Sequence, residues 1–265
     1  MSTQFVTKDS FVWRDAPWGR TLECEPLSEV APHCFTGRDF ALPAGGDVPH
    51  EAWAALAVRV GVAPERLHRL RQVHGCEVAC ADTSNTSALH APLADADVMV
   101  ARAPDVALAV RVADCVPLLI GDPRTGAVAA AHSGWRGTAS NVPRVAVRAL
   151  ADRYGARPAD LVAAIGPSIG GCCYQVGPEV RDAFAVTGHS SADLDAWFAP
   201  DRDGRFRLDL WRACRDQLLA AGVPVGQVHL AGICTATCED WCWSYRREGE
   251  RAGRMVAVIR PRPTR

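Results

Sequence analysis

Four short apolar runs lie close together in the middle of the chain and constrain its fold more than any other feature. They span Val98–Val100, Val106–Val112, Val116–Ile120 and Ala127–Ala131, with short polar or turn-forming segments between them. Each run has the length of a buried β-strand. Links this short leave no room for the helical crossover that joins parallel neighbours. The region therefore predicts a mixed or antiparallel sheet rather than a regular βαβ series.

Helical patterns flank this strand-rich region on both sides. Three helices are predicted, each between a polar cap and a terminating glycine, over residues 47–61, 140–155 and 209–222. Residues 1–30 are weakly patterned, and the chain has no internal repeat and no linker long enough to divide two domains. We therefore expect residues 1–265 to form a single domain of the α/β (α+β) class.

The overall composition argues against several classes of protein. The 265 residues carry 29 basic and 30 acidic side chains, and a nucleic-acid-binding protein would usually show a basic excess. No stretch approaches the roughly 18 uninterrupted apolar residues of a membrane span, and the first residues do not resemble a secretion signal. The 11 cysteines are an odd number, which fits a reduced cytoplasmic chain better than a disulfide framework.

Three apolar stretches each end in a residue that can bind a metal, with glycine or proline just beyond. These residues are His74, Cys115 and His132. They lie 41 and 17 residues apart, so they cannot form a local zinc-finger loop and meet only if neighbouring strands bring them together. Two imidazoles and one thiolate would leave a fourth position open, as in catalytic zinc sites. Spacing alone equally allows three structural residues of the core.

Other polar residues near these stretches have two interpretations each. Asp114 could orient a ligand imidazole, or it could simply end a strand. Arg136 and Arg246 could bind phosphate oxygens through their planar guanidinium groups, or they could form surface ion pairs.

Residues 166–170 match the G-x-S-x-G pattern of a hydrolase nucleophile, with Ser168 at its centre. That motif requires a helix directly after the serine, and the glycines at 170, 171 and 177 would interrupt one. We therefore expect a structural turn or a loop that contacts ligand through its backbone. A serine hydrolase remains a minor alternative.

Two further groups of cysteines are close enough in the sequence to be considered as metal ligands. Cys234, Cys238 and Cys242 are four residues apart, but they form no C-x-x-C motif and are expected to be core or loop residues. Cys172 and Cys173 are adjacent, and in an extended segment their side chains would diverge. We therefore expect no shared metal at this pair.

Nine short motifs occur in an order that identifies a family. They are Gln-Val-His-Gly at 72–75, Asp-Ala-Asp at 95–97, Ala-Asp-Cys-Val-Pro-Leu-Leu at 113–119, Ala-His-Ser-Gly-Trp-Arg-Gly-Thr at 131–138, Ile-Gly-Pro-Ser-Ile-Gly at 165–170, Cys-Cys-Tyr-Gln-Val-Gly at 172–177, Cys-Thr at 234–235, Ser-Tyr-Arg-Arg at 244–247 and Gly-Arg-Met at 253–255. With these motifs the chain resembles the YfiH family, also called the laccase-domain or multicopper polyphenol oxidase family.

The resemblance implies a layered sandwich with a mixed β-sheet flanked by helices. It also implies zinc-dependent purine nucleoside phosphorylase activity with adenosine deaminase activity. The metal ligands it implies are His74, Cys115 and His132, which with Asp114 would form the catalytic group. The residues it places around substrate or phosphate are Gln72, Arg136, Tyr245, Arg246 and Arg38. Arg38 matches the family only approximately, in a shortened stretch, and Trp241–Trp243 stands where the family usually has two phenylalanines.

The histidine content argues for one of the two activities that the family names imply, the phosphorylase, over the other, the oxidase. A multicopper oxidase holds its coppers largely through His-x-His pairs, whereas this chain has 8 histidines and no such pair. One Zn²⁺ per chain suits a set of two histidines and one cysteine. The leading hypothesis is therefore a zinc-dependent phosphorylase of adenosine, inosine, guanosine or methylthioadenosine, with phosphate as its second substrate. The alternatives are a copper-dependent polyphenol oxidase and a non-enzymatic metal or redox sensor. The sequence does not distinguish a monomer from a homodimer.

Overall fold

The computed structural model describes residues 10–40, 42, 50–82 and 94–263. The expected helix cap at Asp47 lies outside these residues. Within the described part of the chain, no helix is both long enough and apolar enough to cross a membrane.

The first of two large sheets contains strands from both ends of the chain. Its six strands run in the order β1-β2-β3-β15-β7-β4. Their bounds are β1 Phe11–Ala16, β2 Gly19–Cys24, β3 His33–Thr36, β15 Met255–Ile259, β7 Ala107–Val112 and β4 Leu67–Arg69. Only β4 and β7 pair in parallel, and the other neighbours are antiparallel.

The second large sheet is built around three of the four predicted apolar runs. Its six strands run in the order β14-β10-β8-β9-β6-β5. Their bounds are β14 Val228–Leu230, β10 Val162–Ile165, β8 Val116–Gly121, β9 Val128–Ser133, β6 Val98–Ala101 and β5 Val78–Cys80. The end pairs β10–β14 and β5–β6 are parallel, whereas the central pairs are antiparallel. The predicted mixed sheet is confirmed.

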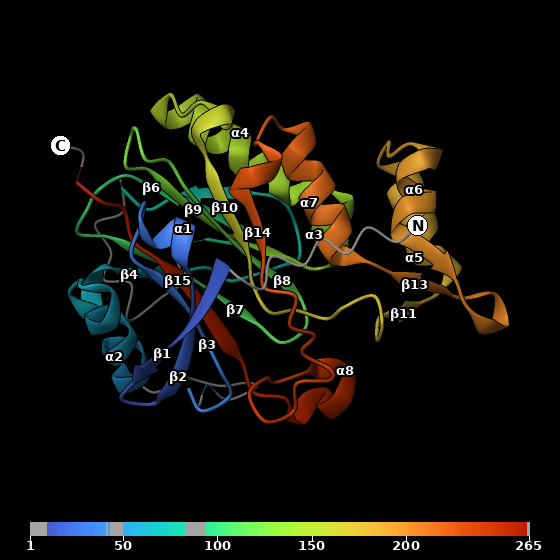
Figure 1. The fold of residues 1–265 in the computed structure, drawn as a ribbon, viewed down its shortest axis with the longest axis horizontal. Helices are drawn as coiled ribbons and strands as arrows, with labels where there is room; N and C mark the ends of the chain where they lie inside the picture. The colour runs from blue at the N-terminus through green and yellow to red at the C-terminus, as the bar shows by residue number, and fades with distance from the viewer. Residues whose placement is uncertain (1–9, 41, 43–49, 83–93, 264–265) are drawn as a thin grey trace.

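The two sheets pack face to face, with helices on both outer faces (Figure 1). Alternation along β8 shows how the layers form, because Leu119 faces the other sheet while Leu118 faces the helices. Helices α4 (Val142–Tyr154) and α7 (Leu210–Ala220) cover the second sheet, and α2 (His50–Val60) covers the first. The layered α/β sandwich is confirmed, with two mixed sheets at its centre.

The ends of the helices follow the predicted signals. Asn141 precedes α4 in a left-handed conformation, with φ 60°, and Gly155 ends the helix with φ 67°. The Asp209 carboxylate accepts a hydrogen bond from the amide of Arg212 in the first turn of α7. The side chain of Asn141 makes no capping hydrogen bond, whereas Asp209 and Gly155 act as predicted, and both helices are confirmed.

The remaining elements are short and surround the two sheets. A small third sheet contains β11 (Gln175–Val176), β13 (Phe206–Leu208) and β12 (Phe198–Pro200). The remaining helices are α1 Glu25–Ser28, α3 Trp135–Ala139, α5 Pro178–Val186, α6 Ser191–Trp197 and α8 Tyr245–Glu248. Single 3₁₀ turns span Pro64–Arg66, Pro158–Asp160, Arg202–Gly204, Val225–Gln227 and Gly249–Arg251.

Candidate metal centre and cavity

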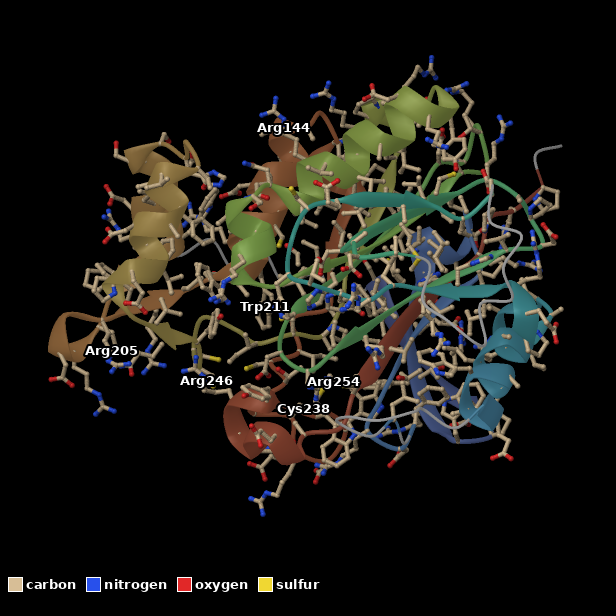
Figure 2. The ribbon with its side chains drawn as sticks, turned by 180° about the vertical axis from the view of Figure 1, so that it is seen from behind. Arg144, Arg205, Trp211, Cys238, Arg246 and Arg254 are labelled. Carbon is tan, nitrogen blue, oxygen red and sulfur yellow. The ribbon has the colours of Figure 1, made fainter. Side chains whose placement is uncertain are left out.

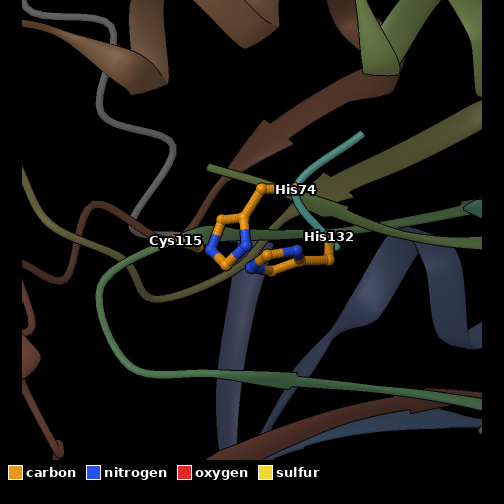
Figure 3. A group of neighbouring side chains, drawn as sticks. All are labelled: His74, Cys115 and His132. Atoms are coloured by element: carbon orange, nitrogen blue, oxygen red, sulfur yellow. The ribbon is translucent and has the colours of Figure 1, made fainter. Parts of the chain in front are cut away.

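The structure brings His74, Cys115 and His132 together at one edge of the sandwich (Figure 3). Their ligand atoms all lie within 4.8 Å of one another. His74 lies in the link from β4 to β5, Cys115 in the link from β7 to β8, and His132 near the end of β9. The two imidazole rings are 4.9 Å apart and nearly perpendicular, at 79°. Neighbouring strands therefore produce the convergence that spacing alone could not establish.

A single buried carboxylate positions both histidines. One oxygen of Asp97 lies 2.7 Å from Nδ1 of His132, which leaves Nε2 as the free ring nitrogen. The other oxygen accepts hydrogen bonds from the amides of Val73, at 3.1 Å, and Gly75, at 2.7 Å. His74 lies between these amides with φ 62°, a left-handed conformation that costs free energy unless it is held in place. Asp97 holds it.

The electrostatics of the centre favour a deprotonated sulfur. Burial alone would raise the pKa of the Cys115 thiol, but His132 and His74 lower it to about 6. Burial alone would lower the pKa of His132, but Cys115 and Asp97 raise it to about 9. The neighbouring histidines therefore favour the thiolate form of Cys115, which is the form that binds a metal. Two imidazoles, a thiolate and a carboxylate behind one imidazole are a donor set that fits a catalytic zinc ion.

Position 134, two residues after His132, has room only for glycine. A Cβ atom at this position would lie 2.9 Å from Sγ of Cys115 and 3.1 Å from Cδ2 of His74. Because its φ is an ordinary −73°, the requirement for glycine comes from space rather than from backbone conformation.

The centre opens into a cavity of 770 Å³. Five further residues suggested by the sequence line this cavity: Gln72, Asp114, Arg136, Tyr245 and Arg246. The cavity is also lined by four polar or aromatic residues that the sequence did not indicate as site residues: Arg111, Trp135, Tyr174 and Arg254. Figure 2 labels two of these residues, Arg246 in α8 and Arg254 directly before β15.

Gln72 and Asp114 position backbone rather than the metal centre. The Gln72 side-chain amide donates to the carbonyl of Arg111 and accepts from its amide, both at 2.8 Å, and so fastens the His74 link to β7. Asp114 accepts hydrogen bonds from Oγ1 of Thr235 and from the amide of Arg246, both at 2.6 Å. Asp114 therefore anchors α8, and the hydrogen bonds of its carboxylate go to these groups rather than to a ligand imidazole. Asp97 makes that contact instead.

Arg38, expected to bind substrate, is not among the residues that line the cavity. Its guanidinium pairs with Glu248 at 3.4 Å and lies 4.1 Å above the Trp243 ring. It also donates to the carbonyl of Glu239. The guanidinium of Arg38 is therefore engaged in contacts that hold the segment around Trp243 in place.

Two arginines missed by the sequence analysis form a cationic wall of the cavity. The antiparallel pairing of β7 with β15 sets Val112 opposite Met255, which brings Arg111 and Arg254 to the same edge. Burial lowers the pKa of Arg111, and the positive charge of Arg254 lowers it further. Among the described residues, no carboxylate forms an ion pair with either arginine. Arg254 donates through Nη1 to the carbonyls of Ala252 and Gly253, at 2.6 and 3.1 Å, which fixes its position without neutralising its charge. Two neighbouring guanidinium groups without a carboxylate partner favour an anion between them.

Ser168 has no access to a substrate. The residue is fully buried, its hydroxyl donates to the carbonyl of Gly166 at 3.1 Å, and it accepts from Nε1 of Trp211 at 2.8 Å. These bonds support the structural turn expected from the sequence and leave nothing to activate the hydroxyl.

A family model and several relatives of known name place the chain in the same family. A family model described as "Multi-copper polyphenol oxidoreductase laccase" matches residues 47–262. A purine nucleoside phosphorylase of Bacteroides thetaiotaomicron is 40% identical over 62% of this chain, an alignment that spans only 60% of that relative. A purine nucleoside phosphorylase of Deinococcus radiodurans is 37% identical over 87% of this chain and 89% of the relative.

Two further similarities agree with this family. Adenosine deaminase RL5, from an unknown prokaryotic organism, is 34% identical over 79% of this chain and 80% of its own length. The crystal structure of YlmD from Geobacillus stearothermophilus superposes with a TM-score of 0.84 at 29% identity, covering 95% of this chain and 99% of that chain. From its motifs, its fold and these relatives, the chain belongs to the multi-copper polyphenol oxidoreductase laccase family.

Proposed function

We propose that this chain is a purine nucleoside phosphorylase that holds one zinc ion on His74, Cys115 and His132. The observation that carries the proposal is the convergence of these three residues at the base of a cavity that also exposes four arginines. Relatives named purine nucleoside phosphorylase support the choice of a nucleoside and phosphate as substrates. When bound, a zinc ion in this centre supplies Lewis acidity.

The remaining residues of the cavity fit the two substrates. Arg111 and Arg254 offer guanidinium groups for phosphate, because planar forks match its oxygen atoms. The aromatic rings of Trp135, Tyr174 and Tyr245 offer faces against which a purine can stack. In phosphorolysis a phosphate oxygen forms a bond to the anomeric carbon of the ribose while the bond to the base breaks. The base leaves with that electron pair and takes up a proton.

Product analysis tests this function. Zinc-loaded protein incubated with inosine and phosphate should release free hypoxanthine and ribose 1-phosphate in equal amounts, and only when phosphate is present. His132→Ala should abolish this release, whereas Arg144→Gln, an exposed change on α4, should leave it intact. Base release that is absent from the wild type, or unchanged in His132→Ala, would refute the proposal. So would more than one copper per chain with phenol oxidation.

Adenosine deamination is a second candidate, favoured by the similarity to adenosine deaminase RL5. This reaction needs water in place of phosphate, so it should yield inosine and ammonia from adenosine in phosphate-free buffer. Phosphorolysis should stop in the same buffer. The two activities are therefore separated by one change of conditions.

A further inference from the structure

A second group of metal-binding side chains lies outside the candidate centre. The sulfur atoms of Cys172, Cys173 and Cys234 are all within 4.8 Å of one another. Cys172 and Cys173 lie between β10 and β11, and Cys234 follows β14. Because β10 and β14 are parallel neighbours, the segments after them leave the same edge of the sheet. Ser168 and Cys234 then form a bridge that holds the two segments together.

The expectation that Cys172 and Cys173 diverge is wrong, because the chain turns here. The amides of Cys173 and Tyr174 both donate to the carbonyl of Gly170, at 2.9 and 3.1 Å. The extended backbone that would separate the two side chains is absent, and the two sulfurs lie 3.6 Å apart. The amide of Gly170 also donates to Sγ of Cys234 at 3.3 Å. One turn therefore gathers all three sulfur atoms.

The separation of the sulfurs fits a shared metal ion. A disulfide needs about 2.05 Å between sulfur atoms. Three thiolates bound in a plane to one ion at about 2.3 Å would lie roughly 4.0 Å apart. The sulfur atoms here all lie within 4.8 Å of one another, with 3.6 Å between Cys172 and Cys173. Cys172 is exposed, which gives an ion access, while Cys234 is only 7% exposed and fixed by backbone contacts.

We propose that Cys172, Cys173 and Cys234 form a second metal site that takes one Cu(I) ion. Among the described residues no further histidine, cysteine or carboxylate joins this group, so the protein offers three sulfur atoms alone. Thiolates select soft ions, and Cu(I) is satisfied by three sulfurs, whereas zinc at these three cysteines would need a fourth ligand from solvent. Arg207, which pairs with Asp201 at 2.6 Å, also donates through its guanidinium to the carbonyl of Cys172 at 2.8 Å and so fastens this turn to β13.

Binding at this site exchanges protons for metal–sulfur bonds. Partial desolvation in the turn and the neighbouring sulfurs raise the pKa of Cys172 to about 12. Burial alone would raise the pKa of Cys234, but hydrogen bonds from the amides of Gly170 and Ala236 lower it. Each thiol that still carries a proton releases it to solvent as its bond to the ion forms. Copper enters as Cu(I), so no electron is transferred.

A titration in which the first centre is disabled tests the second site. The full chain carrying Cys115→Ser should be reduced, freed of metal and titrated with Cu(I) against a coloured Cu(I) chelator. We expect one tightly held Cu(I) per chain and an ultraviolet thiolate-to-copper band. Adding Cys172→Ser, an exposed change that the fold tolerates, should weaken binding at least tenfold. Cys238→Ser, in the loop that follows Cys234 and labelled in Figure 2, is the matched control and should leave binding unchanged.

Three outcomes would overturn this proposal. One is Cu(I) affinity that is the same with and without Cys172→Ser. Another is tighter binding of Zn²⁺ than of Cu(I) to the same three cysteines. The last is a disulfide among these cysteines, found by mass spectrometry, in protein that binds no Cu(I). None of these results depends on nucleoside turnover, so they are independent of the proposed phosphorylase activity.

Discussion

Asp97 links the two histidines of the candidate centre through one side chain. It contacts the ring of His132 and the two amides on either side of His74, and it is completely buried. No other described carboxylate makes these contacts. Loss of this group should therefore disturb both imidazoles together, even though Asp97 is not one of the proposed ligands.

Asp97→Asn should weaken zinc binding about 10- to 100-fold, the usual effect of losing a carboxylate behind a ligand histidine. An asparagine has the same shape but can no longer accept through both of its terminal atoms. Competition with a zinc chelator measures the change. Asp95→Asn is the matched control, since Asp95 is half exposed and pairs with Arg71 at the surface. Equal zinc affinity in the two variants would refute the role of Asp97.

His33 should make the stability of the fold depend on pH. Burial lowers its pKa to about 4, and its Nε2 accepts a hydrogen bond from the amide of Cys24. The unfolded chain, with a pKa near 6.5, binds the proton more readily, so stability is full above about pH 6.5 and falls as the pH drops toward 4. The loss due to His33 is about 3 kcal/mol.

Urea unfolding at pH 7.5 and 4.5 measures this loss. In His33→Gln, which keeps one donor and one acceptor, the fall in unfolding free energy should be smaller than in the wild type. Part of the fall should remain, because burial lowers the pKa of His68 in the same way. Identical pH dependence in the two proteins would rule out His33 as a source.

The sequence indicated the three converging residues of the candidate centre better than the residues that support them. His74, Cys115 and His132 are recognisable because a residue that can bind a metal follows each apolar run. The role of Asp97 depends on the pairing of β6 with β9, which brings its carbonyl within 2.8 Å of the His132 amide. Arg111 lies inside an apolar run, and only the pairing with β15 reveals its neighbour Arg254.

At the scale of elements, the pairing of β7 with β15 creates the proposed phosphate site. Arg254→Gln should raise the KM for phosphate about tenfold or more, because a charge-assisted hydrogen bond contributes roughly 1.5–3 kcal/mol. The KM for the nucleoside should change much less. Steady-state kinetics with each substrate varied in turn separates the two effects. Arg144→Gln on α4 is the control, and a larger effect on the nucleoside would contradict the assignment.

At the scale of the whole molecule, the layer between the two sheets should carry much of the stability. Leu119 is fully buried there, so Leu119→Ala should lower the free energy of unfolding by about 2–5 kcal/mol. Val58→Ala, at an exposed position of α2, should change it by less than about 0.5 kcal/mol. Urea denaturation compares the two, and a similar small loss in both would show that the sheets are loosely packed.

The layered architecture was predictable, but the division into two sheets was not. Apolar alternation and turn residues identify the strands, yet they do not say which strands pair. The short strands β4 and β5 follow one another in the chain and join different sheets. Their membership is decided by the partners β7 and β6, which lie further along the sequence. Only tertiary contacts carry that information.

The crossing of the chain between sheets has a consequence for the order of events during synthesis and folding. His74 and Cys115 each lie where the chain passes from the first sheet to the second, and His132 lies near the end of a strand of the second. A nascent chain cannot assemble this triad until residue 132 has left the ribosome and both sheets have docked. A metal ion bound to the three proposed ligands together would therefore report that both sheets had already folded and docked.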